Sequence, residues 1–243
     1  MILQQLFYMF PGYYYGLDIT YFILVILALI LALVTQVKVK SAYFKYSKVP
    51  SQCGMTGREA AERVLALNGV TNVQIQMVSG PFSDHYDPRS NVIRLSEGVY
   101  NSSSVAALGI AAHEAGHACQ YKDQYFPIKI RNAILPIASI GSNLAVPLVL
   151  IGLLFNFYIL IQIGIIFYVA AKLFQLVTLP VEFNASGRAM KTLESGGLLN
   201  DSELKQTRKV LSAAAMTYVA SLAVALMSLL RLILIANGGR RRQ

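Results

Sequence analysis

The segment His113-Glu114-Ala115-Gly116-His117 carries the residues of this chain that are best suited to chemistry. Two histidines four positions apart lie on one face of a helix, about one turn from each other, so both imidazoles can reach a single ion. Glu114 can reach a water molecule in the open position of that ion. The spacing therefore predicts a helix that binds Zn²⁺ through His113 and His117, with Glu114 as the general base.

The chain contains only three histidines, and two of them fall in this motif. The alternative is a helix whose two histidines are ordinary surface or core residues. A structural zinc site needs no carboxylate beside its ligands, whereas a hydrolytic site needs a base there. The residue types therefore favour metal-assisted hydrolysis over a structural role.

The motif leaves the third zinc ligand open, although a catalytic zinc ion usually takes three ligands from the protein. His85, the remaining histidine, is one choice. Glu182 is the better one, because it follows a long apolar segment at a position where we expect a helix to begin. The alternative for Glu182 is an ordinary carboxylate in a first helical turn, which the helix dipole favours.

The elements that must position these residues include membrane spans. The chain is 55% hydrophobic and 14% charged, whereas a soluble domain carries about 25% charged residues. Three apolar runs cover 21–34 (about 17–37 with its neighbours), 134–179 and 210–236. Since a span needs about 20 residues, the sequence predicts three to four transmembrane helices. The last run contains Arg231 and predicts either a full crossing or a partly interfacial helix.

The run 134–179 must fold back on itself. As one helix it would extend about 69 Å, roughly twice the thickness of the hydrocarbon core. We expect a hairpin of two spans that turns near residues 155–158. Two crossings return the chain to the membrane face that it left, which allows Glu182 to meet His113 and His117.

The polar stretch 38–131 predicts a compact α+β unit with a short β-sheet. Thr56 and Glu59 form a capping box at the start of an amphipathic helix that Gly69 closes. Residues 73–78 and 91–96 alternate between apolar and polar side chains, which is typical of half-buried strands. Ser102, Ser103 and Ser104 offer N-caps for the helix that carries the motif and runs to about Tyr121.

These segments divide the chain into five parts. They are an N-terminal region with the first transmembrane helix (1–37), a cytosolic catalytic domain (38–131), a transmembrane hairpin (132–179), a helical segment with the third ligand (180–209), and a C-terminal hydrophobic helix with a basic tail (210–243). The predicted fold class is a mostly helical α+β membrane protein.

The net charge of +9 fits a membrane protein better than a nucleic-acid-binding one. Four lysines directly follow the first span: Lys38, Lys40, Lys45 and Lys48. Positive charges beside a span favour the cytosolic side and anionic lipid headgroups. The partners that we expect are therefore the lipid bilayer and protein or peptide substrates. The two cysteines are far apart in a region expected to be cytosolic, so we expect no disulfide.

Four segments resemble the YugP-like neutral zinc metallopeptidases of bacteria, which are similar to the CAAX-endopeptidase-like group of membrane proteases. The segments are 84–89, 92–100, 111–117 and 180–186. The resemblance covers most of the chain. It implies a zincin-like endopeptidase of the bacterial plasma membrane, with its catalytic domain in the cytosol. The broader group has an Asp four residues after its ligand Glu, where this chain has Ser186.

Two further assignments concern substrate. We expect His85 to stabilise the oxyanion of the tetrahedral intermediate, with Tyr86 and Arg188 behind it; a loop histidine bonded to Asp84 or Asp87 is equally consistent. Residues Asn91, Val92, Ile93 and Arg94 lie in a strand shortly before the motif helix. We expect this strand to form a sheet edge to which an extended substrate adds by main-chain hydrogen bonds. A purely structural edge strand fits the same residues.

Two other functions compete with this one. A site-2-type intramembrane protease would carry the motif inside a hydrophobic span, but the predicted helix begins with serines and ends near Lys122 and Asp123. A membrane scaffold or transporter with a structural zinc ion is the rival from a different class. Replacing Glu114 by Gln separates it from an enzyme, because only an enzyme depends on the base.

Overall fold

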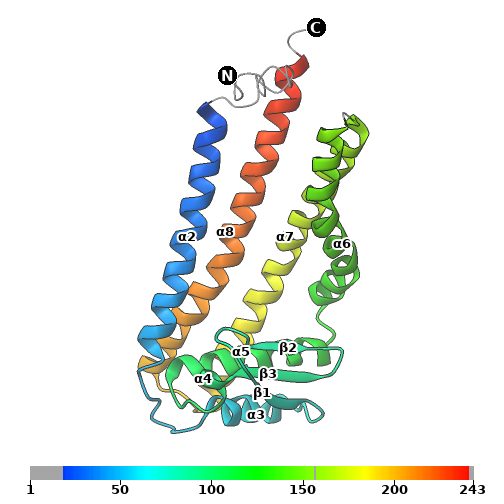
Figure 1. Cartoon of the computed structure of the whole chain (residues 1–243). Coiled ribbons are helices and arrows are strands. Elements are labelled where there is room, and N and C mark those ends of the chain that lie inside the picture. Colours follow the sequence, from blue (N-terminus) through cyan, green and yellow to red (C-terminus); the bar gives the residue numbers. More distant parts are fainter. Residues whose placement is uncertain (1–18, 156, 241–243) are drawn as a thin grey trace.

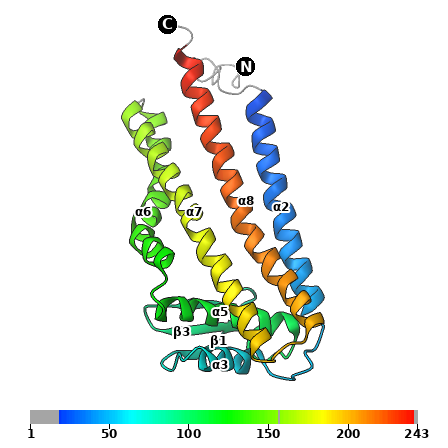
Figure 2. The same cartoon turned by 180° about the vertical axis from the view of Figure 1, so that it is seen from behind.

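The computed structural model describes residues 19–155 and 157–240. Four long helices rise side by side from a small α/β part at one end, as Figures 1 and 2 show from opposite sides. The helices are α2 (Ile19–Tyr46), α6 (Phe126–Leu154), α7 (Tyr158–Ser195) and α8 (Asp201–Arg240). Each contains a segment long and apolar enough to cross a membrane. The protein is therefore mostly helical, with four candidate membrane spans.

The small part contains a three-stranded sheet. The strands β1 (Gln74–Val78), β2 (His85–Asp87) and β3 (Val92–Ser96) are arranged in the order β1-β3-β2. β3 runs parallel to β1 and antiparallel to β2. The expectation that residues 91–94 form a sheet edge is therefore wrong, because β3 is paired on both sides.

Three helices complete this part: α3 (Gly57–Leu67), the short α4 (Glu97–Tyr100) and α5 (Val105–Lys122). The predicted capping box opens α3, where the Thr56 side chain and Glu59 bond to each other's backbone N–H. The Ser104 side chain accepts from the N–H of Ala107 and caps α5. α3, α5 and the sheet share one core, in which Leu108 and Ile93 are fully buried.

Helices α6 and α7 form the predicted hairpin, with α6 ending at Leu154 and α7 beginning at Tyr158. The structure departs from the prediction further along α7. We expected a new helix to begin near Glu182, but α7 continues through Pro180 to Ser195, so the boundary between 179 and 180 falls inside one helix. A proline within a span is tolerated where neighbouring groups satisfy the freed carbonyl.

The last apolar run, 210–236, lies inside α8, which is one continuous helix. Its candidate span covers Asp201–Met227. The predicted N-terminal region before residue 19 and the last three residues of the basic tail lie outside the described residues.

Candidate metal centre

Helices α5 and α7 bring three potential metal ligands together. The ligand atoms of His113, His117 and Glu182 all lie within 4.8 Å of one another. One Glu182 oxygen, Oε2, is 3.4 Å from Nε2 of His113 and 3.6 Å from Nε2 of His117. The two ring centroids are 4.7 Å apart. Both Nε2 atoms therefore face the same carboxylate, and the three donors converge on one point.

Small residues allow α5 and α7 to approach so closely. A Cβ atom on Gly116 would lie 2.6 Å from the carbonyl oxygen of Ala185, a distance that real side chains essentially never show. Three alanines of α5 are also fully buried: Ala111, Ala112 and Ala115. The small residues around the motif thus place the α7 carboxylate beside the imidazoles of α5.

The other nitrogen of each imidazole has a partner. Nδ1 of His113 lies 3.0 Å from Oγ of Ser186, and Nδ1 of His117 lies 3.0 Å from Oε1 of Gln120. A partner at Nδ1 fixes the orientation of a metal-binding histidine. Ser186, four residues after Glu182 in α7, makes this contact with its hydroxyl.

This donor set suits zinc. Two imidazoles and one carboxylate, with an open position for water, are the ligands of many catalytic zinc sites. The charges agree: burial alone would lower the pKa of His117, but the carboxylates of Glu182 and Glu114 hold it above its usual value. A cation between these groups would be stabilised in the same way.

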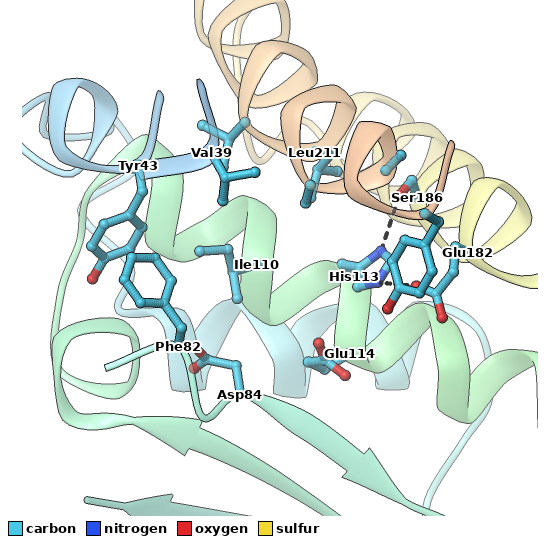
Figure 3. Close-up of a pocket in the computed structure, with 14 residues that line it drawn as sticks. Val39, Tyr43, Phe82, Asp84, Ile110, His113, Glu114, Glu182, Ser186 and Leu211 are labelled. Carbon is cyan, nitrogen blue, oxygen red and sulfur yellow. Dashed lines mark hydrogen bonds and ion pairs between the residues drawn. The ribbon is translucent and has the colours of Figure 1, made fainter. Parts of the chain in front are cut away.

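A cavity of about 190 Å³ is lined by two of the three donors, His113 and Glu182. Tyr43 and Phe82 lie at one end of it and His113 and Glu182 at the other, as Figure 3 shows. Glu114 also lines the cavity and is 8% exposed. Most of the wall is apolar and comes from α2, α5 and α8: Val39, Ile110, Val210, Leu211, Ala214 and Ala215. The cavity therefore joins a polar end to an apolar one.

The structure does not bring His85 to this cavity. His85 is exposed, and its Nδ1 lies 2.7 Å from the carbonyl oxygen of Ser83. Its neighbour Asp84 does line the cavity, but the Asp84 carboxylate accepts hydrogen bonds from the backbone N–H and hydroxyl of Ser96. Asp84 is therefore engaged in holding the β2 end of the sheet.

The four residues expected to bind substrate are engaged elsewhere too. The Asn91 side chain accepts from the hydroxyl of Tyr86 and donates to the carbonyl of Asn72. Val92 and Ile93 are buried in the core, and Arg94 forms an ion pair with Asp87 at 3.0 Å. None of the four is among the described residues that line the cavity.

Sequence reasoning missed Tyr218. This residue of α8 lines the cavity together with His113, Glu114 and Glu182. Its hydroxyl interacts with the carboxylates of Glu182 and Glu114, and the charge of Arg131 acts on it as well. The sequence offers little signal for it, because Ser212, Thr217 and Ser221 also place hydroxyls in the same part of α8.

Comparisons with known proteins point to a zinc peptidase family. Residues 21–237 match a family described as "putative neutral zinc metallopeptidase". The chain is 46% identical to the "putative membrane protease YugP" of Bacillus subtilis over 217 residues, which are 89% of this chain and 96% of that relative. No solved structure matches the chain.

Proposed function

Because this chain belongs to the neutral zinc metallopeptidase family, we propose that it is a membrane-bound endopeptidase whose zinc is held by His113, His117 and Glu182. The observation that carries the proposal is the convergence of these three donors beside a cavity that His113, Glu182 and Glu114 line. A scaffold or transporter with a structural zinc ion gives no reason for a buried carboxylate at this place.

Zinc, when bound, polarises the scissile carbonyl and acidifies the attacking water. Glu114 accepts the proton that the water loses as its oxygen bonds to the carbonyl carbon. Glu114 then gives this proton to the amide nitrogen as the C–N bond breaks. The Glu114 carboxylate thus serves first as base and then as acid. The proton taken from the water ends on the leaving amine, and Glu114 returns to its ionised form.

Tyr218 takes the role that we had expected of His85. As the carbonyl oxygen gains negative charge, a nearby hydroxyl can donate a hydrogen bond to it without losing its own proton. Tyr218 lines the cavity beside the metal ligands, whereas His85 is exposed.

The apolar walls of the cavity favour substrates with apolar side chains near the cleaved bond. Ile110, Leu211 and Ala215 present hydrocarbon to the cavity, and α2 and α8, which supply much of its wall, are candidate membrane spans. Peptide segments close to the bilayer surface suit such a site. We propose that the enzyme lies in a bacterial plasma membrane with this end in the cytosol, because Lys40, Lys45 and Lys48 lie at the α5 end of α2 or just beyond it.

We further propose the functional division given by the sequence. Residues 38–131 and 180–209 would carry the catalytic groups, and 1–37, 132–179 and 210–243 would anchor the chain. The cavity wall qualifies this division, because Tyr218 of the anchoring range 210–243 lines it, and because α2, which supplies Val39, continues from 1–37 into 38–131. The anchoring helices would thus also shape the substrate site.

The decisive variant is Glu114→Gln, with Glu62→Gln as its control. Glu62 pairs with Arg58 on the exposed face of α3 and lies outside the cavity. We expect Glu114→Gln to keep its zinc and to lose peptide cleavage by about 10²–10⁴-fold, while Glu62→Gln keeps both. Proteolysis unchanged in Glu114→Gln would refute the mechanism.

A further inference from the structure

A chain of hydrogen bonds connects His117 with the surface of the protein. Gln120, which is fully buried, contacts Nδ1 of His117 with its Oε1 at 3.0 Å. Its Nε2 donates to the carbonyl oxygen of Val181 at 2.7 Å and to Oδ1 of Asn184 at 2.9 Å. The same Oδ1 accepts from Nε of Arg188 at 2.8 Å. Arg188 forms an ion pair with Asp123.

The chemistry of these groups fixes the direction of every bond in the chain. A guanidinium can only donate, so the Asn184 atom that faces Arg188 must be its oxygen. Because this oxygen can only accept, the Gln120 atom that contacts it must be the NH₂ group. The carbonyl oxygen of Val181 accepts from the same NH₂ group. The oxygen of Gln120 is therefore left to face Nδ1 of His117.

An amide oxygen can only accept, so Nδ1 of His117 must carry the proton. A neutral imidazole protonated at Nδ1 has its lone pair on Nε2, the atom that faces Glu182 at 3.6 Å. We propose that Gln120 is a positioning residue that sets the tautomer of His117 for zinc binding, and that Asn184 and Arg188 hold Gln120 in the required orientation. The inference rests on the proposed role of His117 as a zinc ligand.

The second histidine lacks such a constraint. The partner of Nδ1 of His113 is the hydroxyl of Ser186, which can donate or accept. Ser186 therefore orients the ring without dictating its tautomer. The two ligands differ in this respect, and His117 is the one whose binding form the protein sets in advance.

The test compares zinc affinity, measured by competition with a chelator, among variants of the full-length protein. Gln120→Leu removes both ends of the contact at similar volume, and Asn184→Leu removes one of the two acceptors that orient the amide of Gln120, leaving only the carbonyl of Val181. We expect each to bind zinc about 10–100-fold more weakly. Asn184→Asp is the matched control, because a carboxylate still accepts from Gln120 and Arg188, and its affinity should stay within about threefold of wild type.

A second readout reports on the proton itself. With ¹⁵N-labelled histidine only three rings contribute signals. In the zinc-loaded wild type, the Nδ1 proton of His117 should exchange slowly with solvent, because it is bonded inside the protein. The exchange should accelerate in Asn184→Leu but not in Asn184→Asp. If Gln120→Leu does not fold, the Asn184 pair decides.

The outcomes separate this inference from the proposed function. If the wild type does not bind zinc, or if His117→Ala binds it as tightly as the wild type, the proposed ligand set fails. If the wild type binds zinc and His117→Ala does not, but Asn184→Leu matches the wild type in affinity and proton exchange, the inference about Gln120 is overturned alone.

Discussion

At the scale of single residues, the groups of the site divide into those that would bind metal and those that would handle charge. His113, His117 and Glu182 converge, whereas Glu114 and Tyr218 line the cavity beside them. A ligand is needed to keep the ion, while a proton acceptor or hydrogen-bond donor is needed only while bonds change. Substitution of a ligand should therefore lower the zinc content of the protein, whereas substitution of Glu114 or Tyr218 should leave the zinc content unchanged and lower only the activity.

The Tyr218→Phe variant tests the second kind. Removing one donor to an oxyanion typically costs about 10²–10³ in kcat, and the ring of phenylalanine keeps the packing. We expect a fall of that size in kcat with little change in KM and with full zinc content. Tyr121→Phe serves as the control, because that hydroxyl donates to Asn132 and lies outside the cavity. Steady-state kinetics with a peptide substrate would show equal rates for both variants if Tyr218 had no role.

A carboxylate of the sheet gives a prediction about pH. The Asp87 carboxylate accepts hydrogen bonds from Ser90, from the Arg94 guanidinium and from the backbone N–H of Arg89, which hold its pKa well below the usual value of 3.8. A lowered pKa in the folded state adds stability above the ordinary pKa, and this stability is lost as the pH falls below it. We expect the unfolding temperature of Asp87→Asn to fall less between pH 5 and about pH 3 than that of the wild type. Parallel curves would contradict this.

The sequence predicts the residues of the motif but not their companions. His113, Glu114 and His117 lie in one short segment, so helical geometry alone relates them. Tyr218 and Gln120 depend on contacts between helices that are far apart in the sequence. The position of His85 could not be predicted for the same reason, because the local sequence does not indicate that its ring contacts the backbone carbonyl of Ser83.

At the scale of elements, the site depends on how closely α5 approaches α7. A Cβ on Gly116 would meet the carbonyl oxygen of Ala185, whereas a Cβ on Gly187 of α7 would meet nothing within 4 Å. We expect Gly116→Ala to push the helices apart, weaken zinc binding and lower the free energy of unfolding by about 1–3 kcal/mol.

Gly187→Ala is the matched control for this change. It should leave zinc binding unchanged and raise the free energy of unfolding by about 0.4–1 kcal/mol, since alanine loses less backbone entropy on folding. Zinc titration and denaturant unfolding measure both effects. If Gly116→Ala behaved like Gly187→Ala, the close packing of the two helices would not matter to the site.

The elements themselves could largely be predicted. The apolar runs indicate the spans, and the capping box indicates α3, because both depend on local sequence. Two features could not. The strand β2 has only three residues, too few for a periodic pattern. The end of the apolar run at residue 179 suggested a helix boundary, although α7 continues through it.

At the scale of the whole molecule, the cavity is bounded by four helices, α2, α5, α7 and α8, and by the segment before β2. The return of the chain by two spans could be predicted from the length of the apolar run. The packing of α2 against α8, which closes the cavity, could not be predicted. An apolar helix has too little contrast between its faces to indicate which helix it packs against.

The shape of the cavity predicts a change in specificity. Ala215 is buried in its wall, and Ala215→Phe should fill much of the cavity beside it. We expect kcat/KM to fall by at least about tenfold for peptides with a large apolar residue beside the cleaved bond, and less for peptides with a small one. Ala213→Phe, at a position outside the cavity lining, is the control. An equal loss for both kinds of peptide would show that this end does not receive the side chain.

The central claim is that a carboxylate returned by the α6–α7 hairpin completes the metal site of α5. Metal content measured by mass spectrometry on the purified protein tests it most directly, with Glu182→Ala compared to Glu194→Ala, an exposed carboxylate near the end of the same helix. We expect one zinc ion per chain in the wild type and in Glu194→Ala, and its loss from Glu182→Ala. Stoichiometric, tightly held zinc in Glu182→Ala would contradict it.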